Sequence, residues 1–146
     1  MSLWKQPADL ARINAWSANT MMETLGIRIS AIGDDWLAGT MPVDHRTHQP
    51  YGLLHGGASV VLAETLGSTA AMLTLDPEKE LAVGLDINAN HLRGVRSGIV
   101  TGTARALHIG RTTQVWEIRI ENEDSALVCI SRITMAVIAA RVVGAK

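Results

Sequence analysis

The first strand-like pattern covers residues 27–32, where apolar and polar side chains alternate with the period of a half-buried strand. The turn residues 33–35 separate it from a second strand-length run over residues 36–43, so the two runs predict a hairpin. Four more strand-length runs follow later, with glycine or polar residues between them, and we expect these four to form a meander. They cover residues 81–93, 99–109, 113–120 and 126–138.

Residues 56–75 contain the one long helical candidate, which is rich in Ala, Leu, Val and Met and has no internal proline. This helix is apolar on nearly all sides, and a helix without a polar face has to be surrounded by protein. The order of hairpin, buried helix and four strands therefore predicts an α+β fold in which an antiparallel sheet wraps around a central helix.

Two short helices are predicted before the hairpin. The first covers about residues 7–16, where a proline in the first turn costs no hydrogen bond and Asp9 faces the positive end of the helix dipole. The second begins at Thr20, which has the spacing of a capping box with Glu23, and Gly26 is placed to end it.

Length and composition limit the class of protein. A chain of 146 residues with 47% apolar and 18% charged residues is expected to form one compact domain over residues 1–146. The net charge is −1 and the basic residues are scattered, so no nucleic-acid partner is expected. No apolar stretch reaches the roughly 18 residues of a membrane span, and no signal-peptide pattern follows Lys5, so we expect no membrane partner and a cytoplasmic protein. Cys129, the only cysteine, is expected to be a buried, inert thiol.

Glu64 is the most informative residue for function, because it is the only carboxylate between Asp44 and Asp76 and lies in the middle of the apolar helix. Burying an unpaired carboxylate costs free energy, which favours a functional role. The alternative is a structural glutamate whose tip reaches solvent or pairs with an arginine. Ser68 lies one turn further on and can reach Glu64 or a water that Glu64 holds, although a mid-helix serine often bonds only a carbonyl of the preceding turn.

A histidine and two glycines, His55, Gly56 and Gly57, stand at the start of the same helix. The N–H groups of a helix start lack intrahelical partners and carry the positive end of the dipole, and glycine lets a substrate approach them closely. The segment therefore predicts an oxyanion site. The alternative is that the two glycines serve only to make a tight turn.

The remaining histidines and the missing motifs narrow the chemistry further. His45 and His48 lie three residues apart, but no cysteine partner or clear third ligand accompanies them, so no metal site is predicted. His91 and His108 fall in predicted strands, where a histidine is commonly a structural polar residue, although either could line a cleft. The chain has no Gly-x-Ser-x-Gly sequence, which argues against a serine hydrolase, and no dinucleotide-binding or Walker motif.

A longer motif runs from residue 43 to residue 68 and reads VDxRTxQPxGLLHGGASVVLAETLGS. It resembles the hotdog-fold acyl-CoA thioesterases of the 4-hydroxybenzoyl-CoA (Arthrobacter-type) and phenylacetate-pathway family. Within that family it is similar to the 1,4-dihydroxy-2-naphthoyl-CoA thioesterases and to the proofreading thioesterases of enterobactin synthesis. Further matches over residues 84–91, 107–110 and 114–118 extend the resemblance over nearly the whole chain.

The resemblance implies a role for each residue of the motif. Glu64 would be the nucleophile or the general base that activates water. The Gly56 N–H would polarise the thioester carbonyl with help from His55, and Gln49 and Ser68 would orient the attacking water.

The resemblance also implies an assembly and a set of substrate contacts. The site would be built across a dimer interface, with the glutamate helix of one subunit facing the segment from Gln49 to Gly56 of its partner, and dimers would pair into tetramers. The nucleotide end of CoA would lie at the surface near His91, Arg93, His108 and Arg111, although a structural reading of the arginines is equally good. Thr69 and Met72 would line the acyl pocket, although apolar residues at helical spacing are more often core.

The expected function is hydrolysis of an acyl-CoA, with an aryl group similar to benzoyl, to the free acid and CoA without a metal or organic cofactor. One alternative is an acyl-CoA hydratase or dehydratase on the same fold. Another is a non-catalytic acyl-CoA-binding module, which requires Glu64 to be structural. Residues 141–146 depart from the family, and no role is predicted for them.

Overall fold

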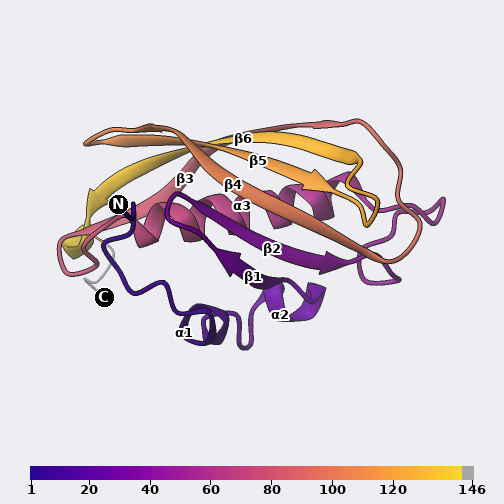
Figure 1. Cartoon of the computed structure of the whole chain (residues 1–146), viewed down its shortest axis with the longest axis horizontal. Coiled ribbons are helices and arrows are strands. Elements are labelled where there is room, and N and C mark those ends of the chain that lie inside the picture. Colours follow the sequence, from indigo (N-terminus) through magenta and orange to yellow (C-terminus); the bar gives the residue numbers. More distant parts are fainter. Residues whose placement is uncertain (143–146) are drawn as a thin grey trace.

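The computed structural model describes residues 1–142, and one antiparallel sheet of six strands forms its framework (Figure 1). The strands are β1 (Arg28–Ile32), β2 (Trp36–Pro42), β3 (Glu80–His91), β4 (Ile99–Ile109), β5 (Thr113–Glu121) and β6 (Leu127–Ala139). Their order across the sheet is β1-β2-β4-β5-β6-β3. The predicted hairpin is confirmed as β1 and β2, and the four later strands are confirmed to within a few residues.

The predicted meander is wrong for β3. β4, β5 and β6 are neighbours in sequence and in the sheet, but β3 pairs with β6, from Glu80 opposite Ala139 to His91 opposite Cys129. β4 has no edge left for β3, because it pairs with β2 on one side and β5 on the other. β3 is therefore an edge strand, and its outer edge is unpaired within residues 1–142.

The long helix α3 (Gly56–Leu73) lies across one face of the sheet and confirms the predicted hotdog arrangement (Figure 1). Small residues let the helix come close to the strands. Gly39 of β2 and Gly102 of β4 stand opposite each other, and a Cβ at either position would lie 2.6 Å or 2.5 Å from a methyl carbon of Leu66. The sheet thus holds α3 by one side only, and that side is fully buried at Leu62, Ala63, Leu66, Ala70 and Ala71.

The C-terminal end of α3 is closed by the N-terminal segment of the chain. The Gln6 side-chain amide donates to the carbonyl oxygens of Met72 at 2.7 Å and Leu75 at 3.2 Å, and the Lys5 N–H donates to Leu73 at 2.8 Å. These bonds satisfy carbonyl groups that the helix itself leaves unpaired.

The helix α1 (Leu10–Ala15) is shorter than predicted. Asp9 is its N-cap, and the carboxylate accepts hydrogen bonds from the N–H groups of Ala11 and Arg12. Because the cap fixes the start of the helix, Pro7 lies before the helix and not in its first turn.

The helix α2 (Met21–Leu25) begins after Thr20 and ends at Gly26, which has a φ of 71°, as predicted. The prediction of a reciprocal capping box between Thr20 and Glu23 is wrong. The Thr20 hydroxyl donates to the Ser17 carbonyl, and the Glu23 carboxylate accepts the N–H of Asn19.

Among residues 1–142, no helix is both long and apolar enough to cross a lipid bilayer. A short 3₁₀ turn, Ala140–Val142, follows β6. The rest of the extension for which no role was predicted, residues 143–146, lies outside the described residues.

Candidate active site

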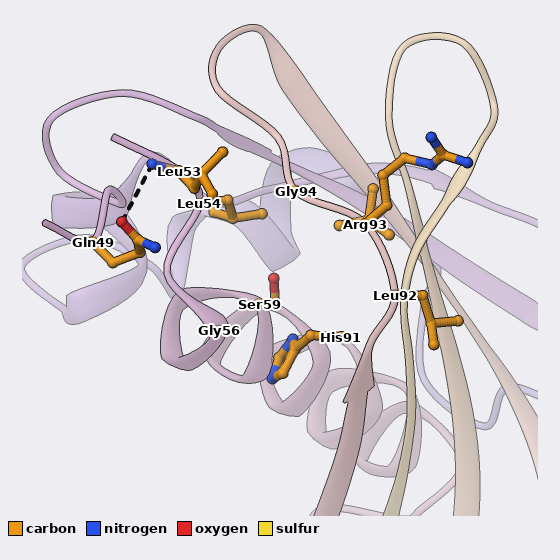
Figure 2. A pocket seen from close by; sticks show the side chains of 10 residues that line it. Gln49, Leu53, Leu54, Gly56, Ser59, His91, Leu92, Arg93 and Gly94 are labelled. Carbon is orange, nitrogen blue, oxygen red and sulfur yellow. Dashed lines mark hydrogen bonds between the residues drawn. The ribbon is translucent and has the colours of Figure 1, made fainter. Parts of the chain in front are cut away.

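A cavity of about 370 Å³ opens at the N-terminal end of α3 (Figure 2). It lies between the loop that precedes α3 and the segment that follows β3. Its polar lining residues are Gln49, Gly56, Ser59, His91 and Arg93. Four of these residues were already singled out from the sequence, namely Gln49, Gly56, His91 and Arg93. The structure adds Ser59 to them.

Gly56 supplies the first N–H of α3. The other N–H groups of this turn are occupied: Gly57 donates to Nδ1 of His55 at 2.7 Å, and Ala58 and Ser59 donate to the His55 carbonyl oxygen. The Gly56 N–H forms no hydrogen bond with any residue that the structure describes. It is therefore free to bind an acceptor at the positive end of the helix dipole.

The cap also fixes the state of the His55 imidazole. Because Nδ1 accepts the Gly57 N–H, this nitrogen carries no proton, so the ring proton is on Nε2. The ring is exposed, so the Nε2–H of His55 is available as a second donor beside Gly56.

The amide of Gln49 is oriented by the backbone of its own loop. Its Oε1 accepts the N–H groups of Tyr51 and, at 3.5 Å, Leu53. Because both partners are donors, they fix which end of the amide is the oxygen. The NH₂ group is therefore turned toward the cavity, where it can donate a hydrogen bond (Figure 2).

His91, at the end of β3, lies against the start of α3. A Cβ at Gly56 would be 2.8 Å from Nε2 of His91, so only glycine leaves room for this contact. The imidazole therefore lies beside Gly56, and the nucleotide contact predicted for His91 stays a prediction.

A buried threonine holds the loop that carries Gln49. The Thr47 hydroxyl donates to the Pro42 carbonyl at 2.8 Å and accepts the N–H of Asp44 at 3.2 Å, and its own carbonyl accepts the N–H of His55 at 2.8 Å. Thr47 is 2% exposed. It thereby ties the end of β2 to the residue that caps α3.

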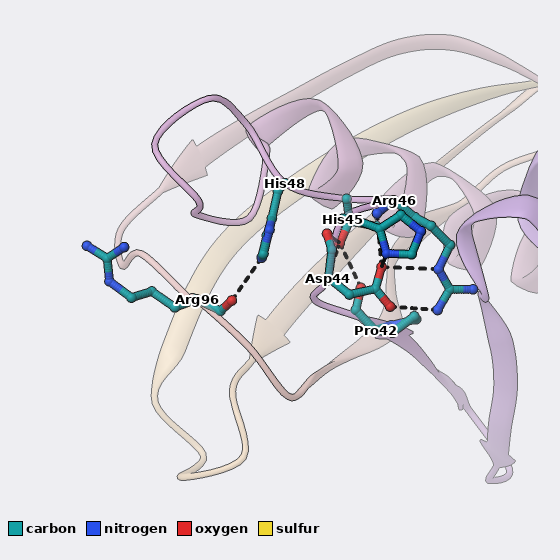
Figure 3. A network of polar contacts seen from close by, with 7 residues as sticks. Pro42, Asp44, His45, Arg46, His48 and Arg96 are labelled. Atoms are coloured by element: carbon teal, nitrogen blue, oxygen red, sulfur yellow. Dashed lines mark hydrogen bonds and ion pairs between the residues drawn. The ribbon is translucent and has the colours of Figure 1, made fainter.

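The same loop has a polar network on its surface (Figure 3). The Arg46 guanidinium donates to both oxygens of Asp44, at 3.1 Å and 2.7 Å, and these hydrogen bonds hold the pKa of Asp44 well below its usual range. His48 Nε2 lies 2.8 Å from the Arg96 carbonyl oxygen, and His45 is exposed beside Asp44. His45 thus lies against its own loop, and His48 joins the loop to the segment between β3 and β4.

We expect Thr47→Val to lower the free energy of unfolding by about 1–3 kcal/mol, because it leaves the Asp44 N–H and the Pro42 carbonyl without their buried partner. Urea denaturation measures this difference. Thr47→Ser keeps the hydroxyl and should recover most of the loss, and equal stability of the valine and serine variants would contradict the role given to the hydroxyl.

Glu64 lies in a different cavity, of about 390 Å³, between α2 and α3. Met21 and Met22 of α2 form the wall facing it. Glu64 is exposed, so the predicted burial of its carboxylate is wrong for a single chain: the sheet covers only one side of α3 and leaves this side open. Its Oε1 lies 2.8 Å from the position of a Cβ on Gly84, so a glycine in β3 lets the carboxylate reach the edge strand.

The other predicted residues on α3 divide between two sides of the helix. Ser68 and Thr69 line the same cavity as Glu64, and the Ser68 hydroxyl lies 3.9 Å from the sulfur of Met135. Met72 is not among the residues that line this cavity. Its sulfur accepts the N–H of Ala82 at 3.3 Å, because the side chain is turned toward β3.

His108 and Arg111 lie at the far end of the sheet from His91. His108 is near the end of β4, and Arg111 lies in the turn between β4 and β5, where it lines a groove with Lys5 and Glu80 near the C-terminal end of α3. β3 runs from Glu80 to His91, so the length of that strand separates the two groups. A single chain therefore does not bring the predicted CoA contacts together.

Sequence reasoning missed several residues of these cavities. Thr47 and Ser59 are ordinary polar residues in apolar or loop surroundings, and nothing in the pattern marks their burial. Met21 and Met22 could be predicted as helical but not as neighbours of Glu64. A glycine inside a strand was the one available signal for Gly84, since it often marks a close approach.

The chain is similar to known thioesterases over nearly its whole length. The model of the Thioesterase superfamily matches residues 51–129. A 1,4-dihydroxy-2-naphthoyl-CoA hydrolase of Escherichia coli is 51% identical over 93% of this chain and 99% of its own. A proofreading thioesterase of Cronobacter sakazakii is 50% identical over 93% of this chain and 98% of its own. The crystal structure of a mutant thioesterase from Pseudomonas aeruginosa has a TM-score of 0.93 at 56% identity, covering 94% of this chain and 99% of that one. The chain therefore belongs to the thioesterase superfamily, and it is a thioester hydrolase.

Proposed function

We propose that this thioesterase hydrolyses an acyl-CoA with an aromatic acyl group and releases the free acid and coenzyme A. Oxygen from water adds to the thioester carbonyl carbon, the carbon–sulfur bond breaks, and the sulfur leaves as the thiolate. The observation that carries the proposal is the free N–H of Gly56, which opens onto a cavity at the start of α3. The name of the relative from Escherichia coli, a dihydroxynaphthoyl-CoA hydrolase, supports both the coenzyme and the aromatic group.

The start of α3 is the oxyanion site in this proposal. A thioester carbonyl oxygen gains negative charge as water adds, and a fixed N–H at a helix start stabilises that charge without reorganisation. Gly56 supplies this N–H, and the Nε2–H of His55 adds a second donor. Removing one such donor typically lowers kcat by about 10²- to 10³-fold. The scheme needs no metal or organic cofactor.

Glu64 is the catalytic carboxylate in this proposal, either as the nucleophile or as the base that takes a proton from water. Its cavity has apolar walls at Met21 and Met22, which exclude solvent from an acyl group. Ser68 lies one turn along the same face and can hold the attacking water, as can the NH₂ group of Gln49.

One chain cannot complete this site by itself. Gly56 and Glu64 are both on α3, and a rise of 1.5 Å per residue separates them by about 12 Å along the helix axis. Reacting atoms have to approach to about 3.5 Å. We therefore infer that Glu64 of one copy acts on a thioester held at Gly56 of a second copy.

The edge strand β3 is the surface best suited to join two copies. Its outer edge is unpaired within the described part of the chain, and Val83 and Leu85 on it are 39% and 63% exposed. Antiparallel pairing of two β3 strands about a two-fold axis would continue the sheet through both copies. The start of one β3 would then lie beside the end of the other. Such a dimer would bring His108 and Arg111 of one copy toward His91 of the other, and the family resemblance implies that two dimers form a tetramer.

A panel of CoA thioesters tests the proposed substrate. Benzoyl-CoA and a hydroxylated naphthoyl-CoA are compared with hexanoyl-CoA and decanoyl-CoA, and a thiol reagent measures released CoA. We expect kcat/KM to be highest for the aromatic thioesters. Equal or higher values for straight chains would reject the aromatic preference, and binding without CoA release from any thioester would reject hydrolysis. Hydration of crotonyl-CoA without CoA release would indicate the hydratase chemistry instead.

A thiol reagent can also test whether the single cysteine of the protein is buried. Cys129 is fully buried on β6, and burial raises the pKa of its thiol. We expect Ellman's reagent at pH 8 to titrate no thiol in the native protein and one per chain in guanidinium chloride. Fast reaction of the native protein would contradict the burial, and a Cys129→Ala variant identifies the reacting thiol.

A further inference from the structure

Ser59 and Gly56 line the same cavity at the start of α3. Ser59 is in the first turn of α3 and is only 1% exposed, yet it lines the cavity. Figure 2 shows its hydroxyl standing above the helix and directed into the space below the segment that follows β3. This hydroxyl forms no hydrogen bond with the residues that the structure describes.

Two other buried hydroxyls of the chain, those of Thr47 and Thr74, have partners. The Thr47 hydroxyl donates to Pro42 at 2.8 Å, and the Thr74 hydroxyl donates to Ala71 at 2.7 Å. The Ser59 hydroxyl has neither such a partner nor a place among the fully buried, unpaired side-chain atoms of residues 1–142. It faces a cavity large enough for part of a substrate, where a ligand can supply the missing hydrogen bond.

We propose that the Ser59 hydroxyl is a substrate contact, which forms a hydrogen bond with a polar group carried close to the thioester carbonyl. The inference rests on the proposed function. Ser59 follows Gly56 by three residues and so lies on the same face of the helix. A carbonyl oxygen bound at Gly56 therefore has the Ser59 hydroxyl as its neighbour along the cavity.

The lining of the cavity limits which chemical groups the Ser59 hydroxyl can bind. Leu54 and Val128 give the cavity apolar walls, and the Ser59 hydroxyl is a polar group without charge in its lining. It fits an amide or a hydroxyl and offers no charge. An acyl-CoA carries such a group on either side of the thioester: the nearest amide of the pantetheine arm, or a hydroxyl on the acyl ring. A site built to form a hydrogen bond with its ligand discriminates strongly against ligands that leave the hydrogen-bonding group unpaired.

The chain contains a matched control in Ser131. This serine of β6 is also buried, at 3%, and its hydroxyl also lacks a partner among the described residues, but it does not line the cavity. Ser131→Ala removes the same atom from a similar environment. Any general effect of deleting a buried, unpaired hydroxyl should therefore appear in both alanine variants.

The test measures binding of two non-hydrolysable thioethers, phenacyl-CoA and its ring-hydroxylated counterpart, by calorimetry. Both keep a carbonyl group near the sulfur. We expect Ser59→Ala to weaken binding by about tenfold, the effect of one lost hydrogen bond in a buried site, while Ser131→Ala binds like the wild type. Loss for both thioethers assigns the contact to the pantetheine amide, and loss for the hydroxylated thioether alone assigns it to the acyl group.

Unchanged affinity of Ser59→Ala for both thioethers overturns the proposal, as does an equal loss in Ser131→Ala. This outcome is separate from a failure of the proposed function, because binding does not require hydrolysis. If the wild type binds both thioethers through Ser59 but releases no CoA from the corresponding thioesters, the contact stands and hydrolysis fails. If the wild type binds neither thioether, both are rejected.

Discussion

Replacing Glu64 by Gln is expected to lower kcat for an aromatic CoA thioester by at least about 10²- to 10⁴-fold, the usual contribution of a general base. Gln keeps the size of the side chain but can neither attack the carbonyl nor take a proton from water. Stability should change little, because Glu64 is exposed and forms no hydrogen bond or ion pair with the residues described. Steady-state rates and thermal unfolding of the same preparation measure the two effects.

Glu78→Gln is the matched control. It removes the same charge from an exposed position in the turn after α3, outside both cavities. Its rate should equal that of the wild type. A Glu64→Gln enzyme within a few-fold of the wild type would reject the catalytic carboxylate, and a large fall in both variants would point to net charge as the cause.

A single turnover in ¹⁸O-labelled water separates the two roles proposed for Glu64. If the carboxylate attacks the thioester and water then attacks the Glu64 carbonyl carbon of the mixed anhydride, the label enters Glu64 and the first product carries unlabelled oxygen. If Glu64 is a base, the label enters the acid directly. Mass spectrometry of the product and of the peptide with Glu64 distinguishes the two roles.

The fold could be predicted from the sequence because each element has a local signal. Alternation over residues 27–32, the turn at 33–35 and the uninterrupted apolar helix all depend on neighbours in the chain. The position of β3 has no local signal. It pairs with β6, far along the sequence, because β2 and β5 occupy both edges of β4, and that competition between strands cannot be read from any single strand.

The candidate site could be predicted only in part, for a related reason. Gln49, His55 and Gly56 lie close in sequence, and the structure brings them to the same helix start. The expected burial of Glu64 was wrong because the apolar pattern of the helix does not say whether its own sheet or another copy covers each side. Val60 and Val61 line the same cavity as Glu64 and are partly exposed. Partly exposed valines are what we expect on a side of the helix that a second copy covers.

Mixing two inactive variants should restore activity if the site is shared between copies. One variant carries Glu64→Gln, and the other carries Gln49→Ala with His55→Ala, which removes donors at the helix start. Each variant alone should be nearly inactive. When the two are co-expressed in equal amounts, a site is intact only if one chain contributes Glu64 and the other contributes the helix start. Random association makes about one site in four intact, so the mixture should reach about a quarter of the wild-type rate.

The size of the recovery decides between a shared site and a site within one chain. If each chain held its own complete site, every chain in the mixture would carry one of the two defects, and no activity would return. Chains purified separately and mixed without exchange of subunits provide the control, and they should stay inactive. Recovery to about a quarter would support the inference from the 12 Å separation along α3: a strand edge and a helix face left open in one chain become a catalytic site when a second copy covers them.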